Sequence, residues 1–543
     1  MIETRPDRRL PVLDPLPAST RLRSPFEAAD ARLAEFRPEA PALPRFHVWT
    51  LGCQMNRSDS EEMAGRLLAA GCAEAPGLED ADLIVINTCA IREAAEAKVI
   101  GRQGQLARLK AANPGLRVVL TGCSVREMDR GRLRRRFPAV DLFLRPDEEP
   151  ELVDRLGLAS AQGVVGVTGA TTLVGRTVVS DAAHLSRTRA EAIAAGAIHR
   201  ASATSAWLPI VYGCDKTCTY CIVPFSRGPE RSRPFDEVVA EARAIAAAGY
   251  PEVTLLGQNV NSYGHDLPPE ARFAHVAEDR RVGRRIDRAS RPDLAELIRA
   301  LDALRAADGR PAIPRLRFVT SHPWDLSDRL IAAMADCPSV CEALHLPVQS
   351  GDDATLRRMG RQYTIDHYLE RLARIRDAVP DIALSTDVIV GFCGESEAAF
   401  ERTLALLEAV GFDQVFAAAY SERPGTPATR LADDVPAGIK RRRLNDLLAR
   451  QEAIGHDRNR AWLGRDVEVL VETIAASSGH GHVDEPHEGH PDELEPAPGE
   501  VRLAGRSRQH KLVHLVGEPA LVGRLVPVRI EHAGPYALRG TLV

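Results

Sequence analysis

Three cysteines follow one another closely in the middle of the chain. Cys214, Cys218 and Cys221 come directly after an apolar run, 208–212, that predicts a β-strand. Three thiolates at this spacing can bind one soft metal centre. A structural zinc site normally has four ligands, and neither Cys nor His follows at short range. The spacing therefore favours a [4Fe–4S] cluster with one iron open to a substrate or cofactor, and zinc with a distant fourth ligand is the alternative.

Three further cysteines share one context near the N-terminus. Cys53, Cys89 and Cys123 each lie two residues beyond a short apolar run. Helical patterns separate these runs, which span 46–51, 83–87 and 118–121, so parallel strands with helices between them are predicted. Ligand sites in open parallel sheets form beyond the carboxyl ends of the strands. We therefore expect the three thiols to converge on one point; otherwise they would be small core residues.

The beginning of the chain carries no apolar segment of the kind that directs secretion. We therefore expect the ten cysteines to be reduced thiols and the protein to be cytoplasmic. No apolar run approaches the ~20 residues that a membrane helix needs, so no membrane span is expected. Three cysteines without a partner pattern are interpreted as structural: Cys72, Cys337 and Cys341.

The middle cysteines lie in Tyr212–Gly228, which reads YGCDKTCTYCIVPFSRG. This run resembles the signature of the radical S-adenosylmethionine (SAM) methylthiotransferases. The resemblance implies that Cys214, Cys218 and Cys221 hold a [4Fe–4S] cluster whose open iron binds SAM. It further implies that one-electron reduction cleaves SAM to methionine and a 5′-deoxyadenosyl radical. Tyr220, inside the motif, is expected to pack beside the cluster.

The N-terminal cysteines strengthen this resemblance. Cys53 lies in LGCQMN, Cys89 in INTCAIR and Cys123 in TGC. These motifs are similar to the family's N-terminal domain, whose three cysteines bind a second [4Fe–4S] cluster. In the family that cluster handles the sulfur of the product. The presence of all six ligands is what makes methylthiolation the specific expectation.

Further motifs follow the predicted strands of the middle segment. GQNVNSY at 257–263 resembles the tRNA-acting branch of the family more than the relatives that modify a ribosomal-protein aspartate. Polar side chains near strand ends are candidate contacts to SAM or the target base, although they could also satisfy loop backbone groups. These candidates are Gln258, Gln349, Ser385 and Asp387. Cys393 departs from the family, which usually has Pro there, and is interpreted as a tolerated small residue.

The elements that must position these residues divide the chain into domains. A disordered extension (1–44), an α/β domain (45–158) and a linker (159–205) are expected to come first. Residues 206–461 alternate six strands with helices, too few for an eight-stranded barrel, so an open partial β/α barrel is expected. Expected strands are 208–212, 252–256, 315–320, 343–347, 382–390 and 414–420. Expected helices include 61–70, 93–112, 236–248, 293–306, 325–335, 365–378, 396–409 and 440–462, and a charged insertion is expected at 265–291.

The last segment, 462–543, is expected to be a small all-β barrel, because short apolar runs alternate with glycine turns. It resembles the TRAM RNA-binding domain through GRSRQ at 505–509 and LRGTL at 538–542. An insertion at 475–499, rich in His, Glu, Asp and Pro, is interpreted as a disordered polar loop rather than a metal site. The TRAM resemblance favours RNA over protein as the substrate.

The net charge of −5 argues against binding nucleic acid over the whole surface, so RNA contacts must be local. Basic runs at 132–136, 440–443 and 502–511 are candidates, although each alone could be a solvated face. The resemblance implies methylthiolation at carbon 2 of N6-(dimethylallyl)adenosine 37, in the anticodon stem-loop of tRNA. It also implies a flavodoxin or ferredoxin as electron donor, a sulfur donor and a monomeric enzyme. Alternatives are threonylcarbamoyladenosine in tRNA, a ribosomal-protein aspartate, and an iron–sulfur RNA sensor without catalysis.

Overall fold

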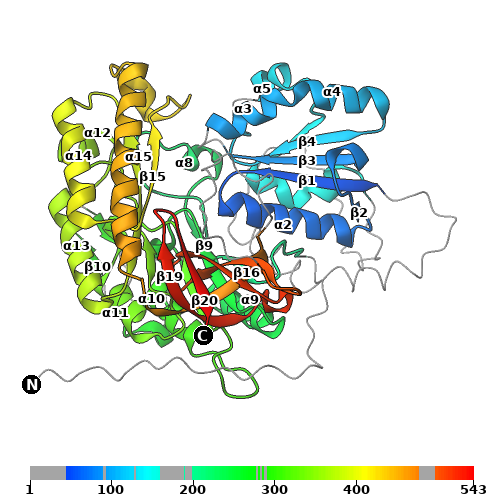
Figure 1. The fold of residues 1–543 in the computed structure, drawn as a ribbon. Helices are drawn as coiled ribbons and strands as arrows, with labels where there is room; N and C mark the ends of the chain where they lie inside the picture. Colours follow the sequence, from blue (N-terminus) through cyan, green and yellow to red (C-terminus); the bar gives the residue numbers. More distant parts are fainter. Residues whose placement is uncertain are drawn as a thin grey trace, which may run out of the picture. The chain divides into compact units, whose positions relative to one another are not determined.

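The structure is a computed structural model of the 543-residue chain (Figure 1). It describes residues 44–89, 93–126, 130–158, 189, 198–276, 279–281, 284–286, 290–475 and 496–543. The predictions for most of the extension 1–44, most of the linker 159–205 and most of the insertion 475–499 fall outside these residues. The chain divides into two compact units, Ala42–Arg458 and a second that contains Asn459–Val543.

The first unit begins with a five-stranded parallel sheet in the order β2-β1-β3-β4-β5. Its strands are β1 (Arg45–Leu51), β2 (Ala73–Glu74), β3 (Leu83–Thr88), β4 (Arg117–Thr121) and β5 (Leu142–Phe143). Every residue of β3 is buried, as is usual for a parallel strand that is covered on both faces. The expected α/β domain with a parallel sheet is confirmed.

Helices cover both faces of this sheet (Figure 1). Alternate β3 residues show it: Ile84 packs with helices α3–α5, and Leu83 packs with α2 and α6. The helices are α2 (Gln54–Ala69), α3 (Glu93–Gly101), α4 (Gln103–Ala112), α5 (Arg130–Arg136) and α6 (Leu152–Arg155), with 3-10 turns η1 (Leu78–Asp80) and η3 (Pro146–Glu151). The expected single helix over 93–112 is wrong, because the helix is interrupted at Arg102, which caps α4 in a non-helical conformation.

Six parallel strands follow in chain order, each beside the next. They are β6 (Ser205–Pro209), β9 (Glu252–Leu256), β12 (Arg315–Phe318), β13 (Ala343–His345), β14 (Ala383–Val390) and β15 (Gln414–Ala419). The pairings form β6-β9-β12 and β13-β14-β15, and a bridge from Leu316 to Val340 joins the two groups. The edge strands β6 and β15 do not pair, so the expected open partial barrel is confirmed.

The helices between these strands pack on the outer face of the barrel. They are α9 (Phe235–Ala247), α10 (Leu294–Asp302), α11 (Asp328–Asp336), α12 (Asp353–Arg358), α13 (Ile365–Ala378) and α14 (Glu397–Val410). Side chains of Asp293, Ser327, Thr364 and Ser396 accept the N–H that starts α10, α11, α13 and α14. Short 3-10 turns also occur: η4 (Val260–Ser262), η5 (Ala271–Phe273), η6 (Pro323–Asp325) and η7 (Pro427–Arg430).

The predicted strand 208–212 is divided in two. β6 ends at Pro209, and β7 (Val211–Tyr212) pairs antiparallel with β8 (Arg231–Ser232). This pairing closes the intervening loop, which contains α8 (Val223–Ser226) and the three middle cysteines. The insertion at 265–291 carries η5 and a hairpin of β10 (Asp279–Arg281) and β11 (Arg284–Ile286).

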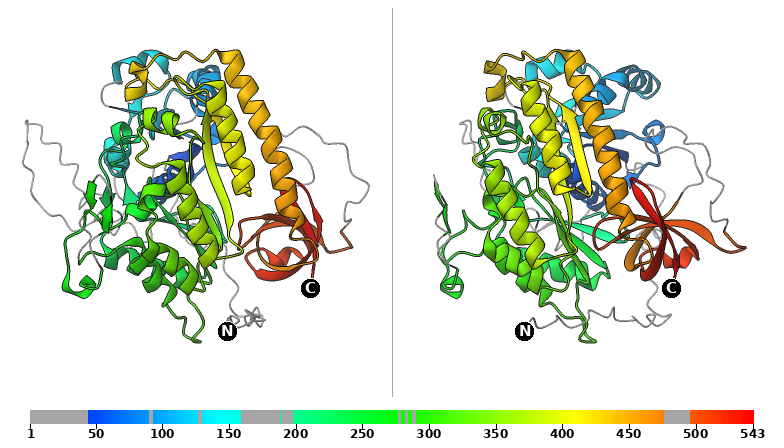
Figure 2. Two further views of the ribbon diagram at one scale, coloured as in Figure 1. Left: turned by 90° about the vertical axis from the view of Figure 1, so that its left-hand side faces the viewer. Right: turned by 60° about the vertical axis from the view of Figure 1, so that its left-hand side comes forward.

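A long helix, α15 (Ala437–Arg460), lies beside α14 (Figure 2), and Arg443 donates to Glu397 across them. The second unit is a closed barrel in the order β16-β17-β18-β20-β19, which confirms the expected small all-β barrel. Its strands are β16 (Asp466–Ile474), β17 (Val501–Ser507), β18 (Leu512–Gly517), β19 (Leu525–Ala533) and β20 (Ala537–Leu542), with η8 (Pro519–Leu521). Valine and leucine side chains of the five strands fill its interior. Among the helices described, none is both long and apolar enough to cross a membrane.

Two glycines have a similar positive φ, but only one of them is crowded by neighbouring backbone. A Cβ on Gly264 (φ +89°) would lie 1.7 Å from the Pro292 carbonyl oxygen, whereas one on Gly309 (φ +82°) would meet no atom within 4 Å. Gly309→Ala should therefore cost only the left-handed strain, about 1–2 kcal/mol. Gly264→Ala should lower the free energy of unfolding by at least about 3 kcal/mol, because backbone must also move. Urea unfolding of the two variants checks this, and equal midpoints would contradict the packing at Gly264.

Candidate active site

The N-terminal cysteines stand at the carboxyl ends of three adjacent strands. Cys53 follows β1, Cys89 follows β3 and Cys123 follows β4, and these strands are neighbours in the sheet. Cys89 and Cys123 are each only 1% exposed. Burial raises the pKa of Cys123 to about 12, and both Cys89 and Cys53 are close enough to raise it further. The structure thus brings these three thiols together.

The buried side-chain amides of Asn56 and Asn87 fix the backbone around these cysteines. Asn56 Nδ2 donates to Asn87 Oδ1 at 2.8 Å, and Asn87 Nδ2 donates back to the Asn56 carbonyl at 2.8 Å. Cys53 is the N-cap of α2, and its N–H donates to Asn56 Oδ1 at 3.3 Å. A Cβ on Gly122 would lie 2.3 Å from the Thr88 carbonyl oxygen, so glycine is required before Cys123. Sequence reasoning did not single out Asn56 and Asn87, although both lie in the cysteine motifs.

The middle cysteines lie on a loop pinned at several points. The Cys214 N–H donates to the Gly228 carbonyl at 3.2 Å, and the Cys221 N–H donates to the Cys218 carbonyl at 3.1 Å. Between them, the Thr219 N–H donates to the Met359 carbonyl at 2.8 Å. Burial raises the pKa of Cys221 to about 12 and raises the pKa of Cys214 above its usual range. Cys218 and Cys221 are close enough to Cys214 to add to that shift.

Both sets of thiols fit an iron–sulfur cluster as ligands. A metal ligand must be a thiolate, and desolvation raises the pKa of Cys123, Cys214 and Cys221, so a cationic centre is needed to hold these three as thiolates. Among the described residues, no group of three Cys, His, Asp or Glu side chains lies closely enough to hold one metal ion. A single zinc ion needs all its sulfurs at roughly 2.3 Å, whereas each cysteine of a [4Fe–4S] cluster binds a different iron.

The two sets of cysteines are neighbours. Cys89, from the N-terminal sheet, is among the groups whose charge raises the pKa of Cys221 on the barrel loop. An arginine contacts each set: Arg227 Nε donates to Cys123 Sγ at 3.1 Å, and Arg361 Nη1 donates to Cys218 Sγ at 3.4 Å. Neither arginine was singled out from the sequence, because only the folded chain brings them to sulfur.

The other predicted site residues fall into separate places. Burial raises the pKa of Tyr220, which lies beside Cys218 and Cys221 and packs edge-on against Phe392 with ring centroids 6.3 Å apart. Gln258 follows β9 and is half-buried. Gln349, 7% exposed, takes a positive φ of 71° and bridges to Val388 on β14.

Ser385 and Asp387 lie on one face of β14, and His345 on the neighbouring strand β13, which was not among the predicted site residues, contacts both. His345 Nδ1 lies 3.0 Å from Ser385 Oγ, and His345 Nε2 lies 3.4 Å from Asp387 Oδ2. The helix-packed core takes the alternate residues, such as Leu384 and Val388, so this trio lines the inside of the barrel.

The remaining cysteines are buried in apolar surroundings. Cys72 packs in the N-terminal core and Cys337 in the barrel core, and Cys341 is 2% exposed. Cys393, in the turn after β14, packs with Met359, Phe392 and Tyr420.

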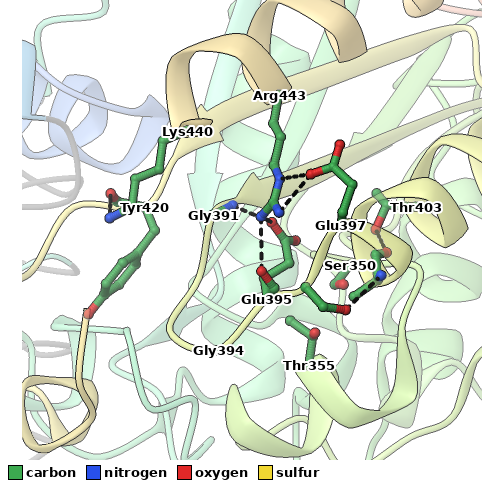
Figure 3. A network of polar contacts seen from close by, with 12 residues as sticks. Ser350, Thr355, Gly391, Gly394, Glu395, Glu397, Thr403, Tyr420, Lys440 and Arg443 are labelled. Carbon is green, nitrogen blue, oxygen red and sulfur yellow. Dashed lines mark hydrogen bonds and ion pairs between the residues drawn. The ribbon is translucent and has the colours of Figure 1, made fainter. Parts of the chain in front are cut away.

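That turn is held by a network of ion pairs and hydrogen bonds (Figure 3). Glu395 Oε2 accepts from the Gly391 N–H at 2.5 Å and from Arg443 Nη1 at 2.9 Å. Lys440 Nζ donates to the Tyr420 carbonyl at 3.2 Å and to both oxygens of Asp433. Interpreting the whole run 440–443 as a solvated face is therefore wrong, because Lys440 and Arg443 are 8% and 4% exposed. Arg443 holds the turn after β14, and Lys440 binds Tyr420 and Asp433 beyond β15.

Comparisons with known proteins agree with this geometry. The Radical SAM superfamily model matches residues 208–407, and a model described as an uncharacterized protein family, UPF0004, matches residues 45–145. A tRNA-2-methylthio-N6-dimethylallyladenosine synthase from Acetivibrio thermocellus is 39% identical over 91% of this chain and 90% of its own. The Roseiflexus sp. enzyme of the same name is 39% identical over 94% of this chain and 92% of its own.

Among solved structures, a radical SAM methyltransferase from Kitasatospora setae covers 71% of this chain and 74% of its own, at 14% identity. Its TM-score is 0.46. The sequence matches define the class, a radical SAM protein with a methylthiotransferase-type N-terminal domain. Within that class, the chain belongs to the family of tRNA-2-methylthio-N6-dimethylallyladenosine synthases.

The pair of Glu395 and Arg443 predicts a large effect on stability. Arg443→Met leaves the buried Glu395 carboxylate without its cation, which should cost about 3–5 kcal/mol. The double variant Glu395→Leu/Arg443→Met should lose less than the single variant, because no charge is then buried alone. Urea unfolding measures all three proteins, with Arg442→Met, an exposed neighbour on the same helix, as a control that should barely change the midpoint. A double variant less stable than Arg443→Met would contradict this account.

Proposed function

We propose that this protein methylthiolates carbon 2 of N6-(dimethylallyl)adenosine at position 37 of tRNA, by radical SAM chemistry with two [4Fe–4S] clusters. The observation that carries the proposal is that the loop of Cys214, Cys218 and Cys221 reaches the N-terminal cysteines, since Arg227, on that loop, donates from Nε to Cys123 Sγ at 3.1 Å. One set alone would support SAM cleavage without a sulfur source. Family membership supports the substrate.

The cysteines have separate roles in this proposal. Cys214, Cys218 and Cys221 hold the cluster that binds SAM, and Cys53, Cys89 and Cys123 hold a second cluster. When bound, the first cluster supplies the electron that cleaves SAM and the second carries the sulfur that is transferred. The chain itself orients these groups: the β7–β8 pair closes the SAM loop, and the strand ends fix the other three thiols.

The inside of the barrel is the proposed place for SAM and the target base. Gln258, Gln349, Ser385 and Asp387 are the proposed contacts, with Tyr220 packed beside the first cluster. His345 holds Ser385 and Asp387 in fixed orientations through both ring nitrogens. The adenine must leave its stack to reach this place, which costs little in a single-stranded loop.

The C-terminal barrel is the proposed tRNA-binding module. Basic side chains on a small β-barrel can follow a phosphate backbone. Lys511 does not belong to that surface, because it is 7% exposed and its Nζ donates to Asn459 Oδ1 at 2.8 Å. The proposal includes the domain boundaries 45–158, 206–461 and 462–543, a cytoplasmic monomer, a flavodoxin or ferredoxin as electron donor, and a separate sulfur donor.

Two triple variants separate the two roles. Changing Cys214, Cys218 and Cys221 to Ala should abolish SAM cleavage and leave about half of the bound iron. Changing Cys53, Cys89 and Cys123 to Ala should also leave about half of the iron, but should preserve SAM cleavage while methylthiolation is lost. Iron analysis and chromatography of 5′-deoxyadenosine and modified nucleoside give the readouts. Methylthio product from the second variant, without added sulfide, would refute the sulfur-site assignment.

The substrate is tested by mass spectrometry of tRNA nucleosides from cells that lack this protein. Methylthio-dimethylallyladenosine should disappear and dimethylallyladenosine should accumulate, and restoring the gene should reverse both changes. The variant without the three N-terminal cysteines is the matched control and should not restore the modification. An unchanged level of that nucleoside, with loss of a methylthiolated threonylcarbamoyladenosine instead, would assign the chemistry to the other tRNA substrate.

A further inference from the structure

Arg227 is a buried cation that contacts the N-terminal cysteine site from the barrel side. We propose that Arg227 is a positioning residue that fixes the N-terminal cysteines against the SAM loop and raises the reduction potential of the cluster they hold. This inference rests on the proposed function, because it requires a cluster at Cys53, Cys89 and Cys123.

The side chain of Arg227 makes two charged contacts with the N-terminal domain. Its Nε donates to Cys123 Sγ at 3.1 Å, and its Nη2 donates to Asp59 Oδ2 at 2.6 Å. Arg227 is 7% exposed, and the Asp59 side chain is 10% exposed. A guanidinium keeps its charge and offers its donors in a fixed plane, so the two contacts define one orientation.

The main chain of Arg227 belongs to the SAM loop. The residue lies six positions after Cys221, and its N–H donates to the Val223 carbonyl at 2.8 Å, which ends α8. The next residue, Gly228, accepts from the Cys214 N–H. Arg227 therefore cannot shift without moving the backbone around Cys214 and Cys221.

The partners of Arg227 belong equally firmly to the other site. Asp59 lies on α2, whose N-cap is Cys53, and Cys123 follows β4. One side chain thus joins two of the three N-terminal cysteines, one directly and one through its helix, to the loop of the other set. Separating the two sites would break two charge-assisted hydrogen bonds at once.

The contact with sulfur also affects the cluster's electronic properties. A hydrogen bond and a positive charge at a ligating sulfur favour the reduced, more negative cluster, so they raise its potential. If Arg227 contacted only Asp59, it would not raise the reduction potential in this way, because no hydrogen bond would then reach the sulfur of Cys123. Asp59, Glu149 and Arg227 also line a cavity of about 40 Å³. Asp59→Asn removes the charge with which Arg227 pairs and leaves its donor to Cys123 in place.

The test uses full-length enzyme with both clusters reconstituted. In Arg227→Met, the potential of the N-terminal cluster should fall, and 5′-deoxyadenosine formed per methylthiolated tRNA should rise roughly tenfold. SAM cleavage should continue, because the sulfur that Arg227 contacts belongs to the N-terminal cysteine set. Arg227→Lys should recover part of the coupling, and Asp59→Asn should change coupling more than potential. Arg371→Met removes another buried arginine paired with an aspartate, on α13, and should change neither readout.

Electron paramagnetic resonance with redox titration separates the possible failures. If Arg227→Met shows the N-terminal cluster at the wild-type potential, and coupling is also unchanged, the inference is wrong. If Arg227→Met does not fold, Arg227→Lys decides with the same two readouts. If the Cys53, Cys89 and Cys123 triple variant keeps all its iron, no second cluster exists there and the proposed function fails instead.

Discussion

The cost of holding thiolates out of water is the constraint on which this structure depends. Cys89, Cys123 and Cys214 are almost fully buried, and burial raises the pKa of Cys123 and Cys214. Such a site is stable only if its backbone is fixed and positive charge is close to the sulfurs. The carboxyl ends of parallel strands meet the first need, and Arg227 and Arg361 meet the second.

The same requirement appears around the barrel as buried arginine–carboxylate pairs. Glu241 on α9 accepts from Arg189, Arg200 and Arg233, and although burial alone would raise its pKa, these cations lower it. Arg189 also donates to Glu62 on α2, which ties the N-terminal domain to the barrel. These pairs hold rigid the strands and turns that carry the site, so small shifts between the two cysteine sets are resisted.

Local patterns predicted the strands, the position of each cysteine after its strand and the partial barrel. Each cysteine set lies directly after an apolar run, and chain order alone places such residues at one edge of a parallel sheet. The structure also departs from these patterns at particular places. Helix α2 begins at Gln54 rather than near 61, because Cys53 caps it and polar residues such as Asn56 face a buried partner. No periodicity reveals a polar helix face that is buried for this reason.

The partners of the site could not be predicted because they are distant in sequence. Arg227 and Cys123 are 104 residues apart, and Arg361 and Cys218 are 143 apart. His345 lies within an expected strand, 343–347, yet its contacts with Ser385 and Asp387 depend on the register of β13 and β14. Basic residues were equally ambiguous, since Lys440 and Arg443 look like surface charges in the sequence and are buried in the fold.

The central claim is that the two cysteine sets lie close together at one site, where Arg227 of one loop contacts Cys123 of the other set. Electron paramagnetic resonance of the enzyme with both clusters reduced tests it most directly. Two paramagnetic clusters, one held by each cysteine set, should interact magnetically. The spectrum should therefore differ from the sum of the spectra of the two triple-cysteine variants. A spectrum equal to that sum, with the spin relaxation of both clusters unchanged, would show that the two sites lie apart and would contradict the account.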